Sequence, residues 1–265
     1  MRPQARCRRR TASDATQPDW SPDGRTIAFE HDLPDDAGAE IALVGSNGGP
    51  VTPLSKDVCV NGQPAFSPDG ERLAYESYDC GTDDALYSRD VNGKAMDRLT
   101  PVASPDGYTD PNYSPDGRRL SYVEYKNGIE FQQALVVARA DGSHPRRMTP
   151  YSFDVGIKQA WSPSGRQLVF TKNADPIKGG PLEADVAVIG ADGSGLRVPT
   201  HYRGGRLSAF AGSYSPNGRW IVYRLQNNQT GRSAIWRMWP DGSHRQMIFE
   251  REGLRARGID WGAPS

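Results

Sequence analysis

The sequence lacks the features that mark several large protein classes. It has no run of about 20 apolar residues, the length that a transmembrane helix requires. Thirty-two Lys and Arg residues balance thirty-two Asp and Glu residues, so the formal net charge is zero. A zero balance gives no basic footprint for nucleic acid or for anionic lipid. We therefore expect no nucleic-acid partner and no membrane insertion.

Motifs that carry common enzyme chemistry are also missing. The chain has no G-x-S-x-G nucleophile elbow, no H-E-x-x-H or C-x-x-C motif and no G-x-x-x-x-G-K phosphate loop. Its four histidines are dispersed, and His144 and His244 stand in equivalent Asp-Gly-Ser-His turns. We therefore expect no catalytic residue, no cofactor, no metal site and no enzymatic activity.

The amino-terminal segment, residues 1–16, is rich in arginine but lacks the apolar core of a signal peptide. As written, the chain carries no export signal. We expect this basic segment, which holds one candidate outer strand, to precede a single domain over residues 17–265.

What the sequence does have is a repeat of an aromatic residue followed by Ser-Pro-Asp-Gly or a close variant. The aromatic residues stand at positions 20, 66, 113, 161 and 214, and a cut-off copy has Trp261 at position 261. An apolar stretch follows each complete unit, and an Asn-Gly or Asp-Gly pair comes later in each repeat. Internal repeats with a period of 20–50 residues indicate solenoids or propellers.

Each repeat has the pattern of four short antiparallel strands. Pro fixes φ, Asp or Asn caps the turn and Gly adopts a positive φ, so Ser-Pro-Asp-Gly predicts a hairpin turn. The later Asn-Gly or Asp-Gly pair predicts a second hairpin. Four strands per repeat of this length are typical of propeller blades. The residues at the aspartate position are interpreted as turn formers: Asp23, Asp69, Asp116, Ser164 and Asn217.

A further copy of the turn sequence, Ser104 to Gly107, lacks both the preceding aromatic residue and the following apolar strand. We expect it to lie in a loop.

The repeat resembles the WD40-like repeats of the TolB β-propeller family over residues 17–262. The matching features are the Ser-Pro-Asp-Gly turn, the Asp-Gly turn, a Pro two residues before the aromatic residue and a terminal Leu-Thr such as Leu99-Thr100. The resemblance implies an all-β, six-bladed propeller of four-stranded antiparallel blades. It also implies a periplasmic or extracellular protein that binds a protein or peptide partner.

Propellers of this family close by joining the two ends of the chain in one blade. Here Ile259 to Trp261 supplies a first strand, and Arg8 to Thr11 aligns with a fourth strand. The second and third strands of that blade are absent. We therefore expect five complete blades and an incomplete sixth, and we interpret the gap as a truncated or misassigned start.

The candidate binding residues stand where the first strand of each blade enters the central channel. Three residues before the aromatic residue lie Gln17, Gln63, Asp110 and Lys158. They predict either a channel mouth that accepts a partner segment or a solvated pore lining.

Acidic residues mark the loops at the same end of the blades, where Asp35, Asp36, Asp83 and Asp84 stand between the second and third strands. They predict either a surface for a basic partner or ordinary solvated loops. No calcium-loop spacing is present.

Two of the three cysteines flank the second blade. If Phe66 lies opposite Arg72 or Leu73, paired positions sum to about 139, and Cys59 and Cys80 meet this condition. They are within reach of a disulfide, which indicates an oxidising compartment. Two unpaired thiols or a weak metal pair are the alternatives. Cys7 is left without a partner.

The hypothesis that follows is a monomeric, non-catalytic scaffold of the cell envelope that binds a protein or peptide on its channel-entrance face. One alternative is a metal-dependent enzyme or carbohydrate-binding propeller that uses the channel. Another is a propeller related to the gating domain of prolyl-oligopeptidase-like peptidases.

Overall fold

The computed structural model describes residues 15–34, 37–55, 59–78, 84–102, 104–126, 132–174, 183–251 and 259–261. Over this part of the chain the protein is all-β apart from single helical turns such as η2 (Tyr151–Phe153). The first two sheets are formed by β1 (Ala15–Trp20), β2 (Thr26–Asp32), β3 (Ala39–Gly45), β4 (Thr52–Pro53), β5 (Val60–Phe66), β6 (Arg72–Tyr78), β7 (Ala85–Asp90) and β8 (Met96–Arg98). The other three are formed by β9 (Asp106–Tyr113), β10 (Arg119–Lys126), β11 (Gln133–Arg139), β12 (Arg146–Arg147), β13 (Val155–Trp161), β14 (Gln167–Ala174), β15 (Glu183–Gly190), β16 (Leu207–Tyr214), β17 (Ile221–Asn227), β18 (Ser233–Met238) and β19 (Gln246–Glu250).

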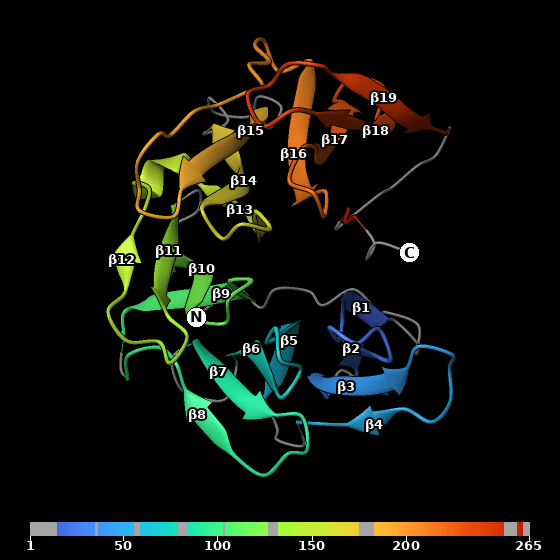
Figure 1. Ribbon diagram of the computed structural model, residues 1–265, viewed down its shortest axis with the longest axis vertical. Coiled ribbons are helices and arrows are strands. Elements are labelled where there is room, and N and C mark those ends of the chain that lie inside the picture. The colour runs from blue at the N-terminus through green and yellow to red at the C-terminus, as the bar shows by residue number, and fades with distance from the viewer. Residues whose placement is uncertain are drawn as a thin grey trace, which may run out of the picture.

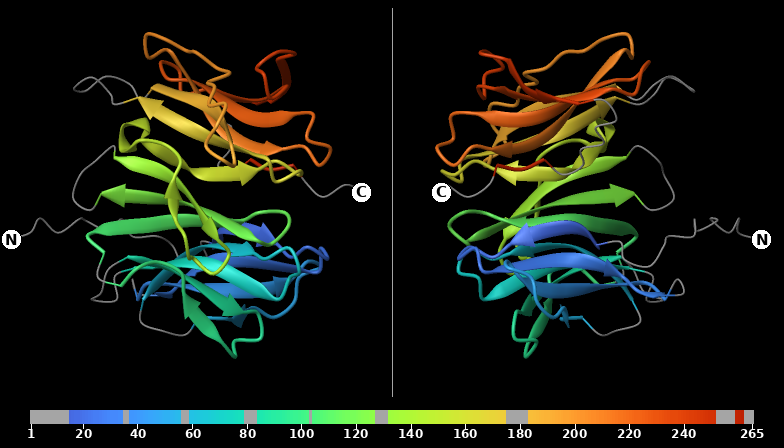
Figure 2. Two further views of the ribbon diagram at one scale, coloured as in Figure 1. Left: turned by 60° about the vertical axis from the view of Figure 1, so that its left-hand side comes forward. Right: turned by 90° about the vertical axis from the view of Figure 1, so that its right-hand side faces the viewer.

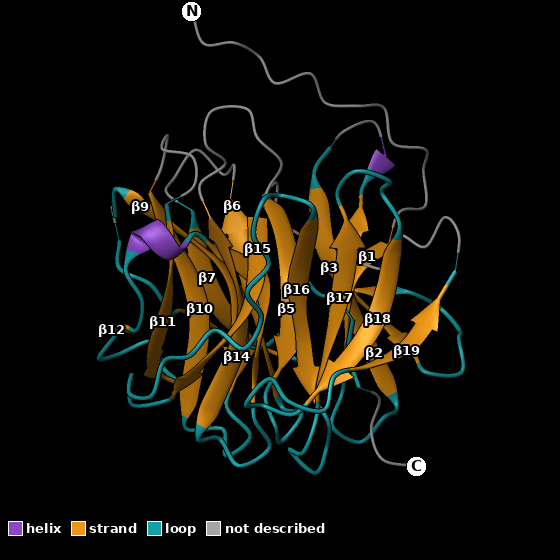
Figure 3. Ribbon diagram, turned by 90° about the horizontal axis from the view of Figure 1, so that it is seen from above, coloured by secondary structure: helices purple, strands orange, loops and turns teal. Residues whose placement is uncertain are grey.

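The strands form five antiparallel sheets, each made of consecutive strands. Four sheets have four strands, and the sheet of β13, β14 and β15 is completed by an isolated bridge between Val188 and Arg197. Figure 1 shows these sheets as blades around a central axis, with β1, β5, β9, β13 and β16 innermost. Figure 2 shows the blades following one another in chain order, and Figure 3 shows the strands with loops and turns at their ends.

The β-propeller and its five complete blades are confirmed, but the incomplete sixth blade of the expected six-bladed ring is not formed by the described residues. Ile259 to Trp261 forms no strand, although the Trp261 amide donates to Ser213 Oγ on β16 at 3.0 Å and Ser213 Oγ donates to Asp260. The physical reason is that these contacts pass through a side chain, and no described strand forms a ladder with the segment. The candidate strand at Arg8 to Thr11 lies outside the described residues.

The expectation that Ser104 to Gly107 lies in a loop is wrong for its second half, because β9 begins at Asp106. Asp106 pairs with Lys126, whose ammonium lies 2.8 Å from the Asp106 carboxylate. Gly107 pairs with Tyr125, and a Cβ at Gly107 would overlap that ring. Cross-strand contacts therefore hold Asp106 and Gly107 in a strand, although the same sequence forms a turn in other repeats.

The hydrophobic core is divided among the interfaces between blades. Four clusters lie between successive blades from the first to the fifth, and each contains side chains from both neighbours. In the cluster between the first two blades, for example, Ile41 packs with Phe66 and Leu73. The alternation of side chains along each strand thus supplies one apolar face to each neighbour.

A hydroxyl at the end of the outer segment repeats in the first four blades. The backbone amides of Ile41, Leu86, Leu135 and Val186 donate to the side chains of Ser55, Thr100, Thr149 and Thr200. The terminal Leu-Thr of the sequence repeat therefore satisfies a buried donor of the third strand.

Every innermost strand contains a bulge just before or at the repeat aromatic residue. The register shifts between Thr16 and Asp19 in β1, between Gly62 and Ala65 in β5, at the corresponding positions of β9 and β13, and one residue later in β16. A bulge adds a residue to one strand and redirects its side chains. It is at these bulges that the candidate channel residues lie.

No helix among the described residues is long and apolar enough to cross a membrane.

Candidate functional site

The four predicted channel residues share an unusual backbone conformation. Gln17, Gln63, Asp110 and Lys158 have φ angles of 52°, 51°, 54° and 74°. Positive φ is uncommon for residues other than glycine and strains the backbone. Gln17, Gln63 and Asp110 each also precede a proline, which ordinarily favours extended backbone. The bulge therefore holds the same strained geometry in four successive blades.

The structure brings three of these residues together through contacts between blades. The Lys158 amide donates to Asp110 Oδ2 at 2.5 Å, and Gln63 Nε2 donates to Thr109 Oγ1, next to Asp110, at 2.7 Å. Gln63 and Asp110 are buried, and Lys158 is half-buried. Gln17 lies at the equivalent position of β1, but no hydrogen bond joins it to the other three.

Asp110 accepts hydrogen bonds that hold the next blade, and its negative charge is unfavourable because the side chain is buried. Besides the Lys158 amide, its Oδ2 accepts the Gln159 amide at 3.3 Å, and its backbone carbonyl accepts Gln159 Nε2 at 2.6 Å. Burial raises the pKa of Asp110, and the positive charge of Lys158 opposes this rise. Among the described residues, no ion pair or hydrogen bond engages the Lys158 ammonium, so this cation acts on Asp110 from a distance.

Glu76, on β6, is a second carboxylate beside the channel residues, and it is half-buried. Thr109 Oγ1 donates a short hydrogen bond to Glu76 Oε2, and Gln63 Nε2 donates to the same oxygen at 3.3 Å. Burial raises the pKa of Glu76 to about 7, and the nearby negative charge of Glu30 adds to the rise. A Cβ at Gly62 would lie 2.8 Å from Glu30 Oε2 and 3.1 Å from Glu76 Oε1. The absence of a side chain at Gly62 therefore leaves room for both carboxylates.

Asp19, on β1, is a third carboxylate at the inner strands, and it is also half-buried. Its Oδ2 accepts the Phe66 amide of the next blade at 2.7 Å. Burial raises the pKa of Asp19 to about 6; Lys158 lowers it and Asp260 raises it. The positive charge of Lys158 therefore acts on both Asp19 and Asp110, which come from different blades. Asp110 in turn raises the pKa of Glu76, so charges from four blades act on one another at the inner strands.

Glu76 and Asp19 were not among the binding residues predicted from the sequence. A signal for Glu76 was present, because a charged residue follows the apolar Leu73-Ala74-Tyr75 within one strand. Charged residues inside a buried strand are rare unless they have partners. Asp19 stands beside the repeat aromatic, at a position that Ala65 and Ala160 fill in other blades, so the repeat gave it no prominence.

Most of the predicted acidic loops and half of the cysteine pair lie outside the described residues. This applies to Asp35, Asp36, Asp83 and Cys80. Asp84 is described, and its Oδ2 accepts the Tyr125 hydroxyl at 2.5 Å. The Cys59–Cys80 disulfide stays a prediction.

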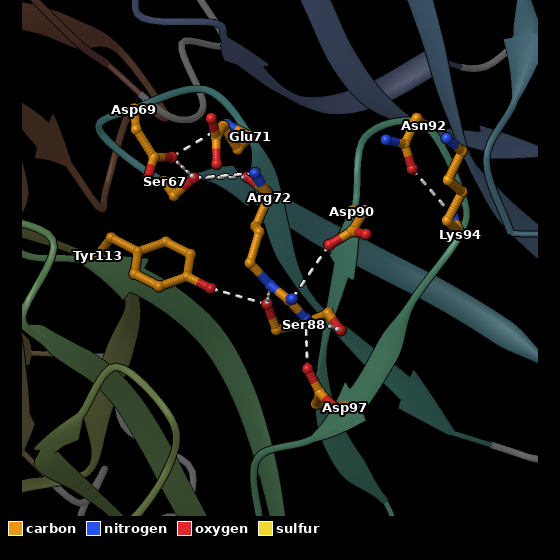
Figure 4. A network of polar contacts seen from close by, with 10 residues as sticks. All are labelled: Ser67, Asp69, Glu71, Arg72, Ser88, Asp90, Asn92, Lys94, Asp97 and Tyr113. Atoms are coloured by element: carbon orange, nitrogen blue, oxygen red, sulfur yellow. Dashed lines mark hydrogen bonds and ion pairs between the residues drawn. The ribbon is translucent and has the colours of Figure 1, made fainter.

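The opposite end of the blades carries the Ser-Pro-Asp-Gly turns, and Figure 4 shows the turn of the second blade. Ser67 Oγ donates to Asp69 Oδ1 at 2.5 Å, and the Glu71 amide donates to the same carboxylate oxygen at 3.0 Å. Arg72 then bridges to the third and fourth strands through Asp90 and Asp97 at 3.0 and 2.7 Å. Equivalent bonds form within the other turns, at Asp23, Asp116, Ser164 and Asn217.

Hollows at the turn end repeat with the blades. Volumes of about 570, 490 and 560 Å³ lie between the first and second, second and third, and third and fourth blades. Residues of the turns, such as Asp69 and Gly70 or Ser164 and Gly165, line them. Because successive blade interfaces repeat the hollow, it follows from the repeat and does not single out one site.

Among the described residues, no group of three or more His, Cys, Asp or Glu side chains is arranged to hold a metal ion.

Comparison with known proteins places the chain among propellers. The sequence profile described as the TolB β-propeller domain matches residues 4–263. A solved structure assigned as TolB from Agrobacterium tumefaciens superposes with a TM-score of 0.69 at 19% identity, over 91% of this chain and 82% of that one. A manganese complex of oligogalacturonate lyase superposes with a TM-score of 0.67 at 14% identity, over 89% of this chain and 65% of that one. At these identities the likeness shows the fold.

A curated relative is an uncharacterized peptidase, YuxL, from Bacillus subtilis, which is 27% identical over 60% of this chain. Another is the uncharacterized protein Atu1656 from Agrobacterium fabrum, which is 30% identical over 46% of this chain. The matches span 22% and 38% of the lengths of these relatives.

Proposed function

This chain belongs to the TolB β-propeller family, and we propose that it is a binding scaffold without chemistry of its own. Its channel-entrance face receives a basic segment of a partner protein or peptide. The proposal places the protein in the periplasm or outside the cell, in keeping with the family resemblance, and takes the scaffold to be a monomer.

The observation that carries the proposal is the group of carboxylates at the inner strands. Asp19, Glu76 and Asp110 come from three blades, and burial raises the pKa of each of them. A carboxylate that has lost its hydration gains from a nearby cation more than an exposed one does. The positive charge of Lys158 lowers the pKa of both Asp19 and Asp110. A Lys or Arg side chain of a partner would supply the missing positive charge.

Binding of a labelled peptide with five arginines separated by Gly-Ser spacers tests this proposal. We expect Glu76→Gln, which keeps the shape and removes the charge, to weaken binding about tenfold in fluorescence anisotropy. Asp141→Asn, at an exposed turn on the opposite end, is the matched control and should change the affinity less than about twofold. Equal losses in the two variants would show that only the overall charge matters and would contradict the proposal.

The pH dependence of the same binding is a second test. Ionised carboxylates attract the peptide, and Glu76 ionises with a pKa of about 7. The affinity should therefore rise between pH 5 and pH 8 in the unaltered protein, and it should rise less in Glu76→Gln. An affinity that is flat across this range would exclude Glu76 from the binding site.

The absence of catalysis is part of the proposal and needs its own assay. Known structures with this fold include an oligogalacturonate lyase bound to manganese, and one curated relative carries the name of a peptidase. We expect neither β-elimination of oligogalacturonate with added Mn²⁺ nor cleavage of prolyl peptides. Turnover of either substrate that disappears in Glu76→Gln would overturn the non-catalytic assignment.

We also propose that Cys59 pairs with Cys80. A disulfide that closes a loop of about 20 residues stabilises by about 3 kcal/mol. Peptide mapping of the unreduced protein should recover the two cysteines in one linked fragment, and reduction should lower the denaturation temperature. Alkylation of both thiols in the native, unreduced protein would contradict the pairing.

A further inference from the structure

The hollows at the turn end are similar in size but differ in charge. Asp23 and Asp69 line the hollow between the first and second blades, and no basic side chain is among the described residues that line it. The hollow between the third and fourth blades is lined by one carboxylate, Asp192, and by three arginines, Arg119, Arg166 and Arg197. A further hollow of about 380 Å³, between the fourth and fifth blades, is lined by Arg197 and Arg219. Arg197 therefore joins two basic hollows.

The turn carboxylates of the first three blades are missing from this part of the surface. Ser164 and Asn217 take their place in the fourth and fifth blades and form the turn bonds without a charge. The carboxylates that remain beside the arginines are Asp192 and Asp241, and each accepts the hydroxyl and the amide of the serine two residues later. Within the described part of the chain, neither of them bonds to an arginine.

The second blade shows how the chain neutralises an arginine at the turn end (Figure 4). Arg72 lies between Asp90 and Asp97, at 3.0 and 2.7 Å. A hydrogen bond of 2.9 Å joins the hydroxyls of Tyr113 and Ser88 beside it. The cation and the phenol of this hollow both have partners from the chain itself.

The fourth blade has different residues at the same positions. Arg197 stands in the position of Asp97, because it bridges to the third strand where Asp97 does. Val188 stands in the position of Ser88. Arg197 Nε donates to the Pro240 carbonyl at 3.1 Å, and no carboxylate of the described residues pairs with this guanidinium. The positive charge of Arg197 therefore has only a neutral partner.

Tyr214 is the counterpart of Tyr113 in the hollow between the fourth and fifth blades. It is 5% exposed, and its buried hydroxyl has no hydrogen-bond partner among the described residues, because Val188 replaces Ser88. Burial raises the pKa of Tyr214, and the positive charge of Arg197 opposes this rise, so the two groups lie near each other. Buried hydroxyls without a partner are uncommon. An anion beside Arg197 would supply the missing acceptor.

Arg219 adds a second cation to the same hollow. Its guanidinium lies 5.2 Å from the centre of the Trp239 ring, and no ion pair within the described ranges engages it. A guanidinium stacked on an aromatic ring keeps the N–H groups at its edge available for a carboxylate. The counterparts Glu71 and Arg166 are exposed although described blades lie on both sides of them. The exposure of Arg219 therefore belongs to its position in the turn.

We propose that these two basic hollows bind an acidic segment of a partner protein, with one of its carboxylates placed between Arg197 and Tyr214. The arginines come from three successive blades, so they match single charges spaced along a chain better than one multiply charged group. A carboxylate is also the group that the second blade itself places against Arg72. The site lies at the opposite end of the blades from the channel entrance and does not depend on the function proposed there.

The aromatic rings beside the arginines favour a peptide over an acidic polysaccharide. His244 stacks on Trp239 with ring centroids 3.4 Å apart, and Arg219 also lies over Trp239. The Arg119 guanidinium lies 4.8 Å from the centre of the Trp161 ring. Side chains of this protein therefore occupy the ring faces on which a sugar would stack.

Binding of a labelled peptide with five aspartates separated by Gly-Ser spacers to the full chain tests the proposal. We expect saturable binding in fluorescence anisotropy, weakened about tenfold by Arg197→Gln and about fivefold by Arg219→Gln. Arg25→Gln removes the same charge at the same turn position of the first blade and should change the affinity less than about twofold. Absence of saturable binding, or equal losses in the Arg219 and Arg25 variants, overturns the proposal.

Two further variants act on the hollow while they retain the turn and the core. Asn217→Asp restores the residue that the first three blades carry at this position, so the turn bonds remain, and it should weaken binding about threefold. Tyr214→Phe should weaken binding about threefold and raise the denaturation temperature of the free protein, because it removes an unpaired buried hydroxyl. A change in the denaturation temperature alone would show a purely structural hydroxyl and would contradict the proposed placement.

Competition identifies the class of ligand and the end of the blades. Oligogalacturonate of matched charge should not displace the peptide, and displacement would show that the hollows accept acidic sugars, which overturns the choice of a peptide. Glu76→Gln, at the channel, should leave binding of the acidic peptide unchanged. A change in affinity as large as that of Arg219→Gln would place the peptide at the channel and would also overturn the proposal.

Discussion

The two ends of the blades use carboxylates in opposite ways. At the turn end, Asp69 accepts the Ser67 hydroxyl and a backbone amide in an exposed loop, and these bonds lower its pKa. Beside the channel, Glu76 also accepts two side-chain donors, yet burial outweighs them and raises its pKa to about 7. Hydrogen bonds favour the charged form in each case, so what differs is the water that each group has lost.

The loss of water distinguishes structural acids from candidate binding acids more clearly than their repetition in the sequence does. The turn acids repeat in the sequence and attract attention, but Ser164 and Asn217 make similar turn bonds without a charge. The inner acids repeat only in part, because the position of Glu76 holds Glu30 in the first blade but Val123 and Thr171 in the third and fourth. A charge that the fold does not require in every blade, and whose burial is unfavourable, is the better candidate for function.

The largest expected effect comes from removing the inner carboxylate with the most backbone bonds. Asp110→Ala would leave the Lys158 and Gln159 amides without their acceptor in a buried setting. Each unsatisfied buried donor costs about 1–3 kcal/mol, so we expect a loss of about 2–4 kcal/mol in urea unfolding. Asp116→Ala, at an exposed turn, is the control and should lose about 1 kcal/mol or less. Equal losses would show that burial does not distinguish the two ends.

The sequence was sufficient for the propeller, because each blade repeats its own turns and apolar strands. It also placed the channel residues at a shared position, which the structure shows to be a bulge with positive φ. The five complete blades were expected, but the incomplete sixth was wrong, because the motif Asp260-Trp261 forms no strand although it matches the start of a blade in sequence. Glu76 escaped notice since its importance depends on Thr109 and Glu30, which belong to neighbouring blades.

A smaller effect is expected from pH, acting through Glu76. Its pKa is about 7 in the folded chain and 4.5 as a free group. Between these values the folded state binds more protons than the unfolded state, so stability should fall as pH rises from about 4.5 to 7. Glu76→Gln removes this contribution. Its denaturation temperature relative to the unaltered protein should therefore rise by a few degrees between pH 4.5 and pH 8.

Other groups also titrate in this range, and the difference between the two proteins isolates Glu76. A constant difference across the range would mean that Glu76 is ionised at the same pH in the folded and unfolded states. In that case the contrast between the two ends of the blades would rest on Asp19 and Asp110 alone.

The smallest expected effect has the opposite sign and comes from the turn end. The pKa of Asp69 is lowered in the fold, so its stabilisation is present above the unfolded pKa, near 3.8, and is lost as pH falls through the folded pKa. Asp69→Asn should therefore be slightly less stable than the unaltered protein at pH 7 and equal to it near pH 2. Carboxyl ¹³C titration by NMR measures the same quantity directly and should show Asp69 ionising well before Glu76 as pH rises. If the two groups titrate together, the hydration argument that distinguishes the two ends fails.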